Sequence, residues 1–185
     1  MFQHAAQFVW PDRAATFIEP GRRQIWLQHR PRPHDLSFLV VDNPFVPQGH
    51  ELIFLRGLFY GLAGDMMLAA HLLTPQLENS IRYVLEQNDV DVSNLDSNLT
   101  QPVKTLGPLL SMPETKKIFG EDWCFEFRGL LIEKTGYSFR HQVAHGFISE
   151  AACYGPEPLN VWWITLRLCY TPIALADQDT GDPKS

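Results

Sequence analysis

Apolar residues recur at helical spacing from about residue 50 onward. The longest apolar run, LIFLRGLFYGLAGDMMLAAHLL, predicts a helix over roughly residues 50–72. The following run, LLTPQLENSIRYVLEQ, predicts a second helix with Thr74 as its N-cap and Pro75 at its first helical position. We therefore expect two separate long helices in this part of the chain.

Further along the chain, EDWCFEFRGLLIEKTG predicts a helix stopped by Gly136, and FRHQVAHGFISEAACYG a helix capped by Ser138. PLNVWWITLRLCYTP predicts a last, buried helix stopped by Pro172. TLGPLLSMP and ETKKIFG indicate short helical pieces, while NDVDVSNLDSNLTQPV is a polar connector. Residues 49–175 should thus form an all-α bundle of about five helices, followed by a flexible tail over 176–185.

Residues 1–48 show a different pattern. Pro31, Pro33, Pro44 and Pro47 break any long helix there, and the runs RQIWLQH and LSFLVVD alternate or cluster apolar residues as strands do. The pattern predicts an irregular N-terminal arm, with room for a short β-hairpin, lying on the main body. Its alternative is the end of a larger upstream domain.

The composition limits the classes of protein to which the chain can belong. The chain has 185 residues, 45% hydrophobic and 12% aromatic, which is typical of one globular domain. The formal net charge of −6 excludes a basic nucleic-acid coat, so any RNA binding requires a local positive patch. Cys124, Cys153 and Cys169 form no CxxC pair. We expect three small buried hydrophobes and a reducing, cytoplasmic setting.

Several classes of site find no support in the sequence. Arg56 and Asp65 interrupt the longest apolar run, and the N-terminus lacks the basic start of a signal peptide, so we expect a soluble helix and no membrane segment. There is no glycine-rich phosphate loop, no HExxH and no convincing carboxylate pair. We expect no cofactor and no metal.

The stretch YSFRHQVAHGF carries the candidate chemistry. Histidine titrates near neutral pH and can serve as a base or an acid, while arginine presents a planar fork of donors to phosphate. Cleavage of RNA without metal needs a base for the 2′-hydroxyl, an acid for the leaving oxygen and a cation for the phosphate. Arg140 and His145 are a minimal set, and two copies in a symmetric dimer would supply both acid and base.

Spacing alone leaves another interpretation open. Five residues on an ideal helix correspond to about 500°, so Arg140 and His145 would point roughly 140° apart. With ten arginines and seven histidines, about one such Arg–His spacing is expected by chance, and Arg22 and Arg23 before His29 provide another. The alternative is a capping arginine and a packed core histidine.

The wider stretch RHQVAHG resembles the Arg-Asn-x-x-x-His-Gly hallmark of a domain-of-unknown-function family. RGLFYGLAGD, HLLTPQLENSIRYVLEQNDV and FEFRGLLIEKTGYSFRHQVAHG also resemble that family, and the resemblance covers roughly residues 44–170. The family is similar to the HEPN superfamily, and its eukaryotic relatives include the endoplasmic reticulum membrane-associated RNA degradation protein. The family usually has Asn where this chain has His141.

The resemblance implies a helical bundle that acts as a homodimer, with Arg–His motifs meeting in a cleft. It implies metal-independent endoribonuclease activity in toxin, defence or RNA-processing settings, RNA as the partner, and an antitoxin or other regulatory protein as a further candidate partner. By position, Arg140 would hold phosphate, His141 would be the polar residue after it, and His145 would be the acid or base.

Glu78 and Arg82, spaced i, i+4, are either a surface ion pair or a pair that orients Arg140 or His145. Two further interpretations of the whole chain stay open. One is a non-catalytic helical domain that dimerises or binds RNA or protein. The other is a C-terminal module of a longer ancestral protein, with the N-terminal arm only packing against the bundle.

Overall fold

The structure, a computed structural model of the chain, describes the backbone of residues 1–93 and 104–180. The prediction of an all-α fold is confirmed, since these residues contain helices and no strand. The helical elements are more numerous than the five that we expected. They are α1 Phe2–His4, η1 Ala5–Val9, α2 Trp10–Arg13, η2 Ala14–Ile18, α3 Glu19–His29, η3 Pro33–Leu39, α4 Glu51–Ala63, α5 Met66–Gln87, α6 Leu106–Ser111, α7 Pro113–Phe119, α8 Glu121–Phe127, η4 Arg128–Ile132, α9 Phe139–Ala144, η5 Ala151–Tyr154 and α10 Pro156–Thr180.

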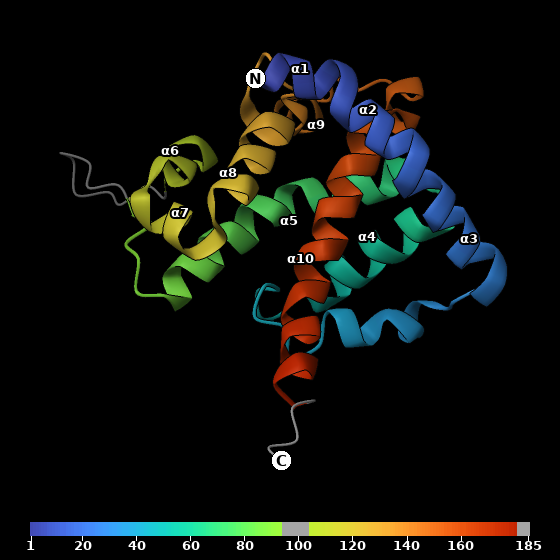
Figure 1. Ribbon diagram of the computed structural model, residues 1–185, viewed down its shortest axis with the longest axis horizontal. Helices are drawn as coiled ribbons and strands as arrows, with labels where there is room; N and C mark the ends of the chain where they lie inside the picture. The colour runs from blue at the N-terminus through green and yellow to red at the C-terminus, as the bar shows by residue number, and fades with distance from the viewer. Residues whose placement is uncertain (94–103, 181–185) are drawn as a thin grey trace.

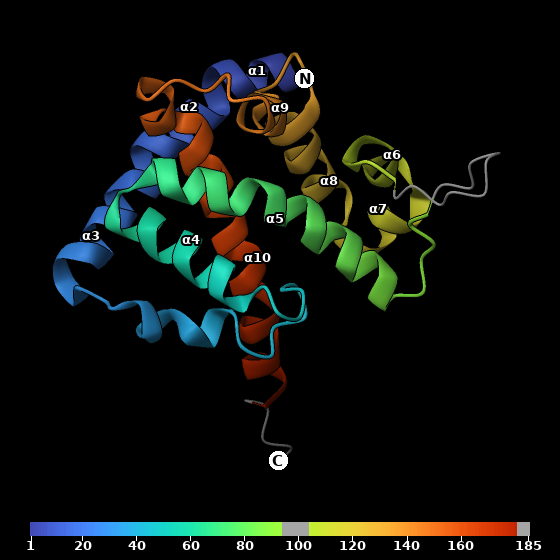
Figure 2. The ribbon, with the colours of Figure 1, turned by 180° about the vertical axis from the view of Figure 1, so that it is seen from behind.

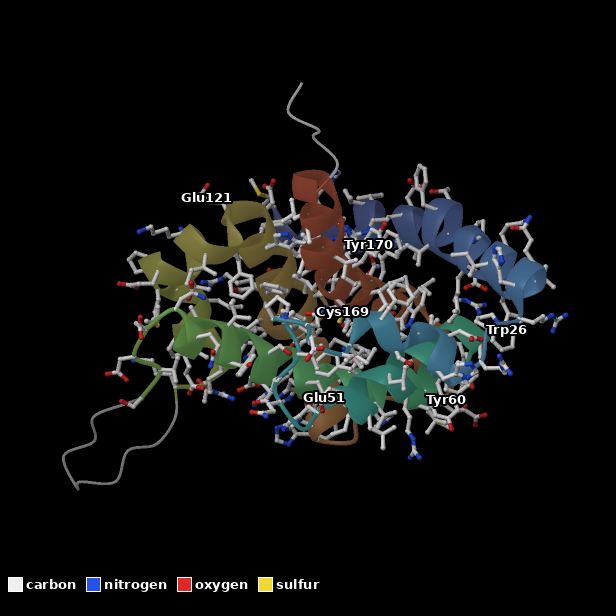
Figure 3. All side chains as sticks on the ribbon, turned by 90° about the horizontal axis from the view of Figure 1, so that it is seen from below. Trp26, Glu51, Tyr60, Glu121, Cys169 and Tyr170 are labelled. Carbon is white, nitrogen blue, oxygen red and sulfur yellow. The ribbon has the colours of Figure 1, made fainter. Side chains whose placement is uncertain are left out.

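Helix α10 runs through the middle of the molecule, with the other elements arranged around it (Figure 1). Elements α1 to α3 form one long curved path past its upper end, while α6, α7 and α8 lie on its other side. Helices α4 and α5 cross α10 on the face seen from behind (Figure 2). Trp26 on α3 and Glu121 at the start of α8 consequently lie on opposite sides of α10 (Figure 3).

The N-terminal segment differs from the prediction. Residues 2–29 are helical, and the expected strand RQIWLQH lies within α3, while most of LSFLVVD belongs to the 3₁₀ helix η3. Two five-residue π-helical segments, η1 and η2, each come just before a proline, Pro11 and Pro20. A π turn shifts the hydrogen-bond register by one residue, which accommodates a proline that has no N–H to donate. The helix therefore bends past both prolines instead of stopping.

A buried polar network fastens this N-terminal helix to the rest of the fold. Arg13 donates from its two terminal nitrogens to the carboxylate of Glu126, at 2.9 Å each, and from Nε and Nη2 to Oδ1 of Asn160, at 2.9 and 2.6 Å. The amide of Asn160, fully buried on α10, donates in turn to the carbonyls of Trp10 and Pro156. We call this the Asn160 network. Residues 1–48 thus contribute to the common core, where the sequence predicted an irregular arm.

The long apolar run is broken into two helices earlier than predicted. Gly64, with a φ of +99°, ends α4, and the side chain of Asp65 accepts a hydrogen bond from the Leu68 N–H to start α5. Thr74 and Pro75 were wrongly placed at a helix start, because both lie inside α5. Pro172 likewise lies inside α10, which continues through residues 176–180 of the expected tail. Residues 181–185, and residues 94–103 of the expected connector, lie outside the described residues.

Buried Arg22 secures the end of α4. Its Nη1 donates to the carbonyl of Leu62 at 2.8 Å, which satisfies one of the last carbonyls of that helix. Its Nε and Nη2 donate to the carboxylate of Glu19, at 2.7 and 2.8 Å. The hydrogen bonds from Arg22 lower the pKa of Glu19 below its ordinary value, more than partial burial raises it.

Asn160→Ala should destabilise the protein by about 2 kcal/mol, because it removes the acceptor of Arg13 Nε and the side-chain donor to the carbonyls of Trp10 and Pro156. The measurement is the free energy of unfolding in urea. Asn88→Ala is the matched control, since exposed Asn88 donates only to the carbonyl of Val84 and should change stability by about 0.5 kcal/mol or less. Equal stability of the two variants would contradict the role given to the Asn160 network.

Glu19 should make part of the stability depend on pH. Because its pKa is lower in the folded state, the ion pair stabilises the protein above the unfolded pKa of about 4.3, and this contribution is lost as the pH falls through the folded value. At neutral pH, Glu19→Gln should be less stable than the parent by about 1 kcal/mol, since the pair is partly screened by solvent. Urea unfolding at about pH 7 and about pH 3 measures this difference, which should shrink at the lower pH. A constant difference at both pH values would contradict the assignment.

Candidate functional site

Helix α9, which carries the motif, is a short helix held between η4 and α5. It lies near α1 at one end of the molecule (Figure 2). The N–H of Tyr137 donates to the carbonyl of Gly129 at 2.9 Å, and the side-chain amide of Gln142 donates to the carbonyl of Tyr137 at 2.8 Å. Phe139 is buried beneath the helix. Ser138 occupies the N-cap, as predicted, but its hydroxyl makes no capping hydrogen bond.

The helix ends much earlier than the sequence predicted. A continuous helix over FRHQVAHGFISEAACYG was expected, yet α9 stops at Ala144. Gly146 has a φ of +66°, its N–H donates to the carbonyl of Val143, and the N–H of Phe147 donates back to the carbonyl of Gln142 at 2.8 Å. This is the Schellman pattern, in which a left-handed residue closes a helix. The chain therefore turns back on α9 immediately after the motif.

This turn gathers three rings on the surface. The ring centroids of His141 and His145 are 4.4 Å apart, and Phe147 stacks on His145 at 5.6 Å with an interplanar angle of 23°. Phe147 also meets His141 edge-on at 5.6 Å. All three side chains are exposed. We call them the aromatic cluster, and its exposure rules out the alternative of His145 as a packed core histidine.

Arg140 points to a different neighbour, helix α5. Its Nε donates to Oε2 of Glu78 at 3.0 Å, and Arg82 donates to Oε1 of the same carboxylate at 3.1 Å. Glu78 is mostly buried, whereas the side chain of Arg140 is 42% exposed. Arg82 also donates to the carbonyl of Lys104 at 3.3 Å. Two guanidinium groups thus share one carboxylate, so this charge triad carries a net charge of +1.

The structure therefore brings the predicted residues together in two neighbouring groups. His141 and His145 lie in the aromatic cluster, and Arg140, Glu78 and Arg82 lie in the charge triad, with α9 joining the two groups. Among the described contacts, Arg140 pairs with Glu78 and not with either imidazole. Sequence reasoning missed Phe147. The signal that could have found it is an aromatic residue directly after a helix-ending glycine.

Other classes of site receive no support from the described part of the chain. Within it, no group of three or more His, Cys, Asp or Glu side chains could hold a metal ion. None of the helices in residues 1–93 and 104–180 has the length and apolar character needed to cross a membrane. Cys124, Cys153 and Cys169 are free and buried, as predicted, and burial raises the pKa of each thiol, that of Cys169 to about 12.

Comparisons of the chain with protein-family models, with curated proteins and with solved structures find no match. The resemblance to the HEPN-like family therefore rests on RHQVAHG and the other stretches of the sequence that resemble that family.

Gly146→Ala should destabilise the protein by about 1 kcal/mol, because an L-residue is disfavoured at the left-handed φ that ends α9. The measurement is thermal unfolding followed by circular dichroism. Gly107→Ala is the matched control. A Cβ would meet nothing within 4 Å at either glycine, but Gly107 lies in α6 without a left-handed φ. That variant should be neutral or stabilising. Equal loss in both variants would refute the conformational explanation.

Proposed function

We propose that this protein is a metal-independent endoribonuclease of HEPN type that uses Arg140, His141 and His145. The observation that supports the proposal most is the exposed His141–His145 pair on the helix whose Arg140 is held by Glu78. Two titratable rings and a fixed cation on one small helix are the groups that RNA transphosphorylation requires.

The reaction needs no reagent besides the RNA and the side chains of the protein. An imidazole takes the proton of a 2′-hydroxyl, the 2′-oxygen attacks the adjacent phosphorus, and the 5′-oxygen leaves with a proton from a second, protonated imidazole. The products are a 2′,3′-cyclic phosphate and a free 5′-hydroxyl. His145 acts as one of these two groups. Arg140 stabilises the charge that develops on the non-bridging oxygens.

Glu78 and Arg82 have supporting roles. Glu78 accepts from Nε of Arg140, so that among the described contacts the terminal nitrogens of the guanidinium stay available to a phosphate. Arg82 compensates the carboxylate, so that the triad stays net positive. This local positive charge can attract a phosphate although the whole chain has a formal net charge of −6.

The His–His distance favours a dimeric site. The attacking and leaving oxygens lie on opposite sides of the phosphorus in an in-line displacement. Ring centroids 4.4 Å apart leave no room for a phosphate between His141 and His145. Both imidazoles of one chain therefore approach from one side, with His141 lying beside His145. A second copy of the chain supplies the group on the opposite side.

A second candidate function is a helical dimerisation or partner-binding domain without catalysis. An open apolar groove between the N-terminal helix and α10 favours it, because exposed apolar patches often mark interaction surfaces. Phe8 and Phe17, which are 61% and 73% exposed, line this groove together with Trp163. Trp162, by contrast, is buried and donates to the carbonyl of Leu58.

The parent protein should cleave a mixed RNA pool in EDTA and leave 2′,3′-cyclic phosphate ends. His145→Ala should lower the rate by about 10²- to 10⁴-fold, and Arg140→Ala by about 10²- to 10³-fold, since each removes a group that acts in the transition state. His141→Ala should also slow cleavage. The measurement is the initial rate of cleavage of a labelled RNA, with product ends identified by mass spectrometry.

His71→Ala and Arg23→Ala are the matched controls, because they remove an exposed histidine and an exposed arginine away from α9. Both should cleave like the parent. Light scattering on the same samples reports the oligomeric state, and the rate per chain should fall on dilution below the dimer dissociation constant. Equal cleavage by all variants would refute the nuclease, and a dimer without cleavage would favour the second candidate.

A further inference from the structure

Phe147 is a large apolar side chain that the fold does not bury. It is 69% exposed, although it lies directly beside the two histidines of the site. One face of its ring packs on His145 in a nearly parallel arrangement, and the high exposure of the side chain leaves much of the remaining ring surface open. Such a ring does little for the core, so its position calls for another explanation.

The backbone holds this ring in a defined place. The N–H of Phe147 donates to the carbonyl of Gln142 at 2.8 Å, and Gly146 supplies the left-handed turn between them. The amide of Gln142 in turn donates to the carbonyl of Tyr137. A ring fixed by its own backbone loses little freedom when a ligand binds against it, so more of the contact energy contributes to affinity.

We propose that Phe147 is a stacking platform for an unpaired nucleobase next to the phosphate held by Arg140 and His145. This inference rests on the proposed function and names its substrate class as single-stranded or looped RNA. A base can lie on the open face of Phe147 only when it is unstacked from its neighbours, which a duplex does not allow. Stacking on an aromatic ring is tolerant of sequence, because every base has a π-face.

The platform also explains how the site would read RNA without many polar contacts. The charge triad gives one net positive charge, which binds phosphate but carries no information about the base. Phe147 adds a requirement for an accessible base, and its preference should follow stacking strength, with purines favoured over pyrimidines. Cleavage should therefore concentrate in loops and single-stranded regions next to purines.

The test is binding of a short oligodeoxynucleotide that carries 2-aminopurine, a base whose fluorescence falls on stacking. It lacks the 2′-hydroxyl and cannot be cleaved, so binding is measured apart from catalysis. Phe147→Leu should bind about 5- to 100-fold more weakly and lose the quenching, while Phe147→Trp should keep both. A second oligonucleotide carries an abasic position in place of 2-aminopurine. The parent should bind it more weakly than it binds the 2-aminopurine oligonucleotide, whereas Phe147→Leu should bind both with equal affinity.

Phe38→Leu is the matched control, because Phe38 is 56% exposed on η3, outside the aromatic cluster and outside the groove that Phe8 and Phe17 line. It should bind like the parent. Parent-like binding and quenching by Phe147→Leu would overturn the platform even if the protein cleaves RNA. Quenching by the parent alone would support the platform even if cleavage fails. Absence of binding by the parent, or loss of the dimer in Phe147→Leu on light scattering, would also overturn it.

Discussion

The position of α9, and with it the candidate site, depends on the buried amide of Asn160. This side chain ties Arg13 and the Trp10 carbonyl to α10, and Arg13 ties α8 through Glu126. With α2 fixed in this way, the Trp10 ring packs so closely on η4 that a Cβ at Gly129 would lie 2.3 Å from it. The carbonyl of Gly129 then accepts the Tyr137 N–H and fixes the turn into α9. A polar network far from the motif thus contributes to the position of the motif, because any shift of these elements would leave the buried Asn160 side chain without its partners.

Helical period was enough to predict the fold class and much of the helical body, but not the N-terminal segment. Pro31 and Pro33 do follow the end of α3, as expected of helix breakers. Pro11 and Pro20 do not break the helix, because π turns precede them and the buried faces of Trp10, Ala14 and Ile18 hold the bent helix on the core. Tertiary packing here outweighs the local helix-breaking effect of proline. Pro75 and Pro172 likewise lie inside helices, α5 and α10, and these two helices pack against each other and against α4.

The sequence predicted which residues carry the candidate chemistry, and that stays a prediction, but it did not predict how these residues are arranged. The spacing argument assumed one continuous helix through Arg140 and His145, whereas Gly146 ends α9 and makes His145 its C-cap. The relevant pair on one face is then His141 and His145, spaced i, i+4, and Arg140 reaches across to Glu78. Neither the Arg140–Glu78 contact nor the position of Phe147 can be predicted from the helical periodicity of the sequence. The first joins residues 62 positions apart, and the second depends on a turn that a single glycine conformation decides.

Other apolar side chains of the described chain are exposed as well, Phe17 to 73%, but the aromatic cluster sets an exposed ring against two imidazoles. The largest rings of the core, such as Trp10, Phe54 and Phe127, are fully buried. At α9, by contrast, two histidines and a phenylalanine are exposed together and held there by a backbone motif. Natural sequences depart from local consistency mainly where function requires it. The proposed ligand would complete the packing of this exposed ring, and the neighbouring imidazoles and guanidinium favour a ligand that carries both a phosphate and a base.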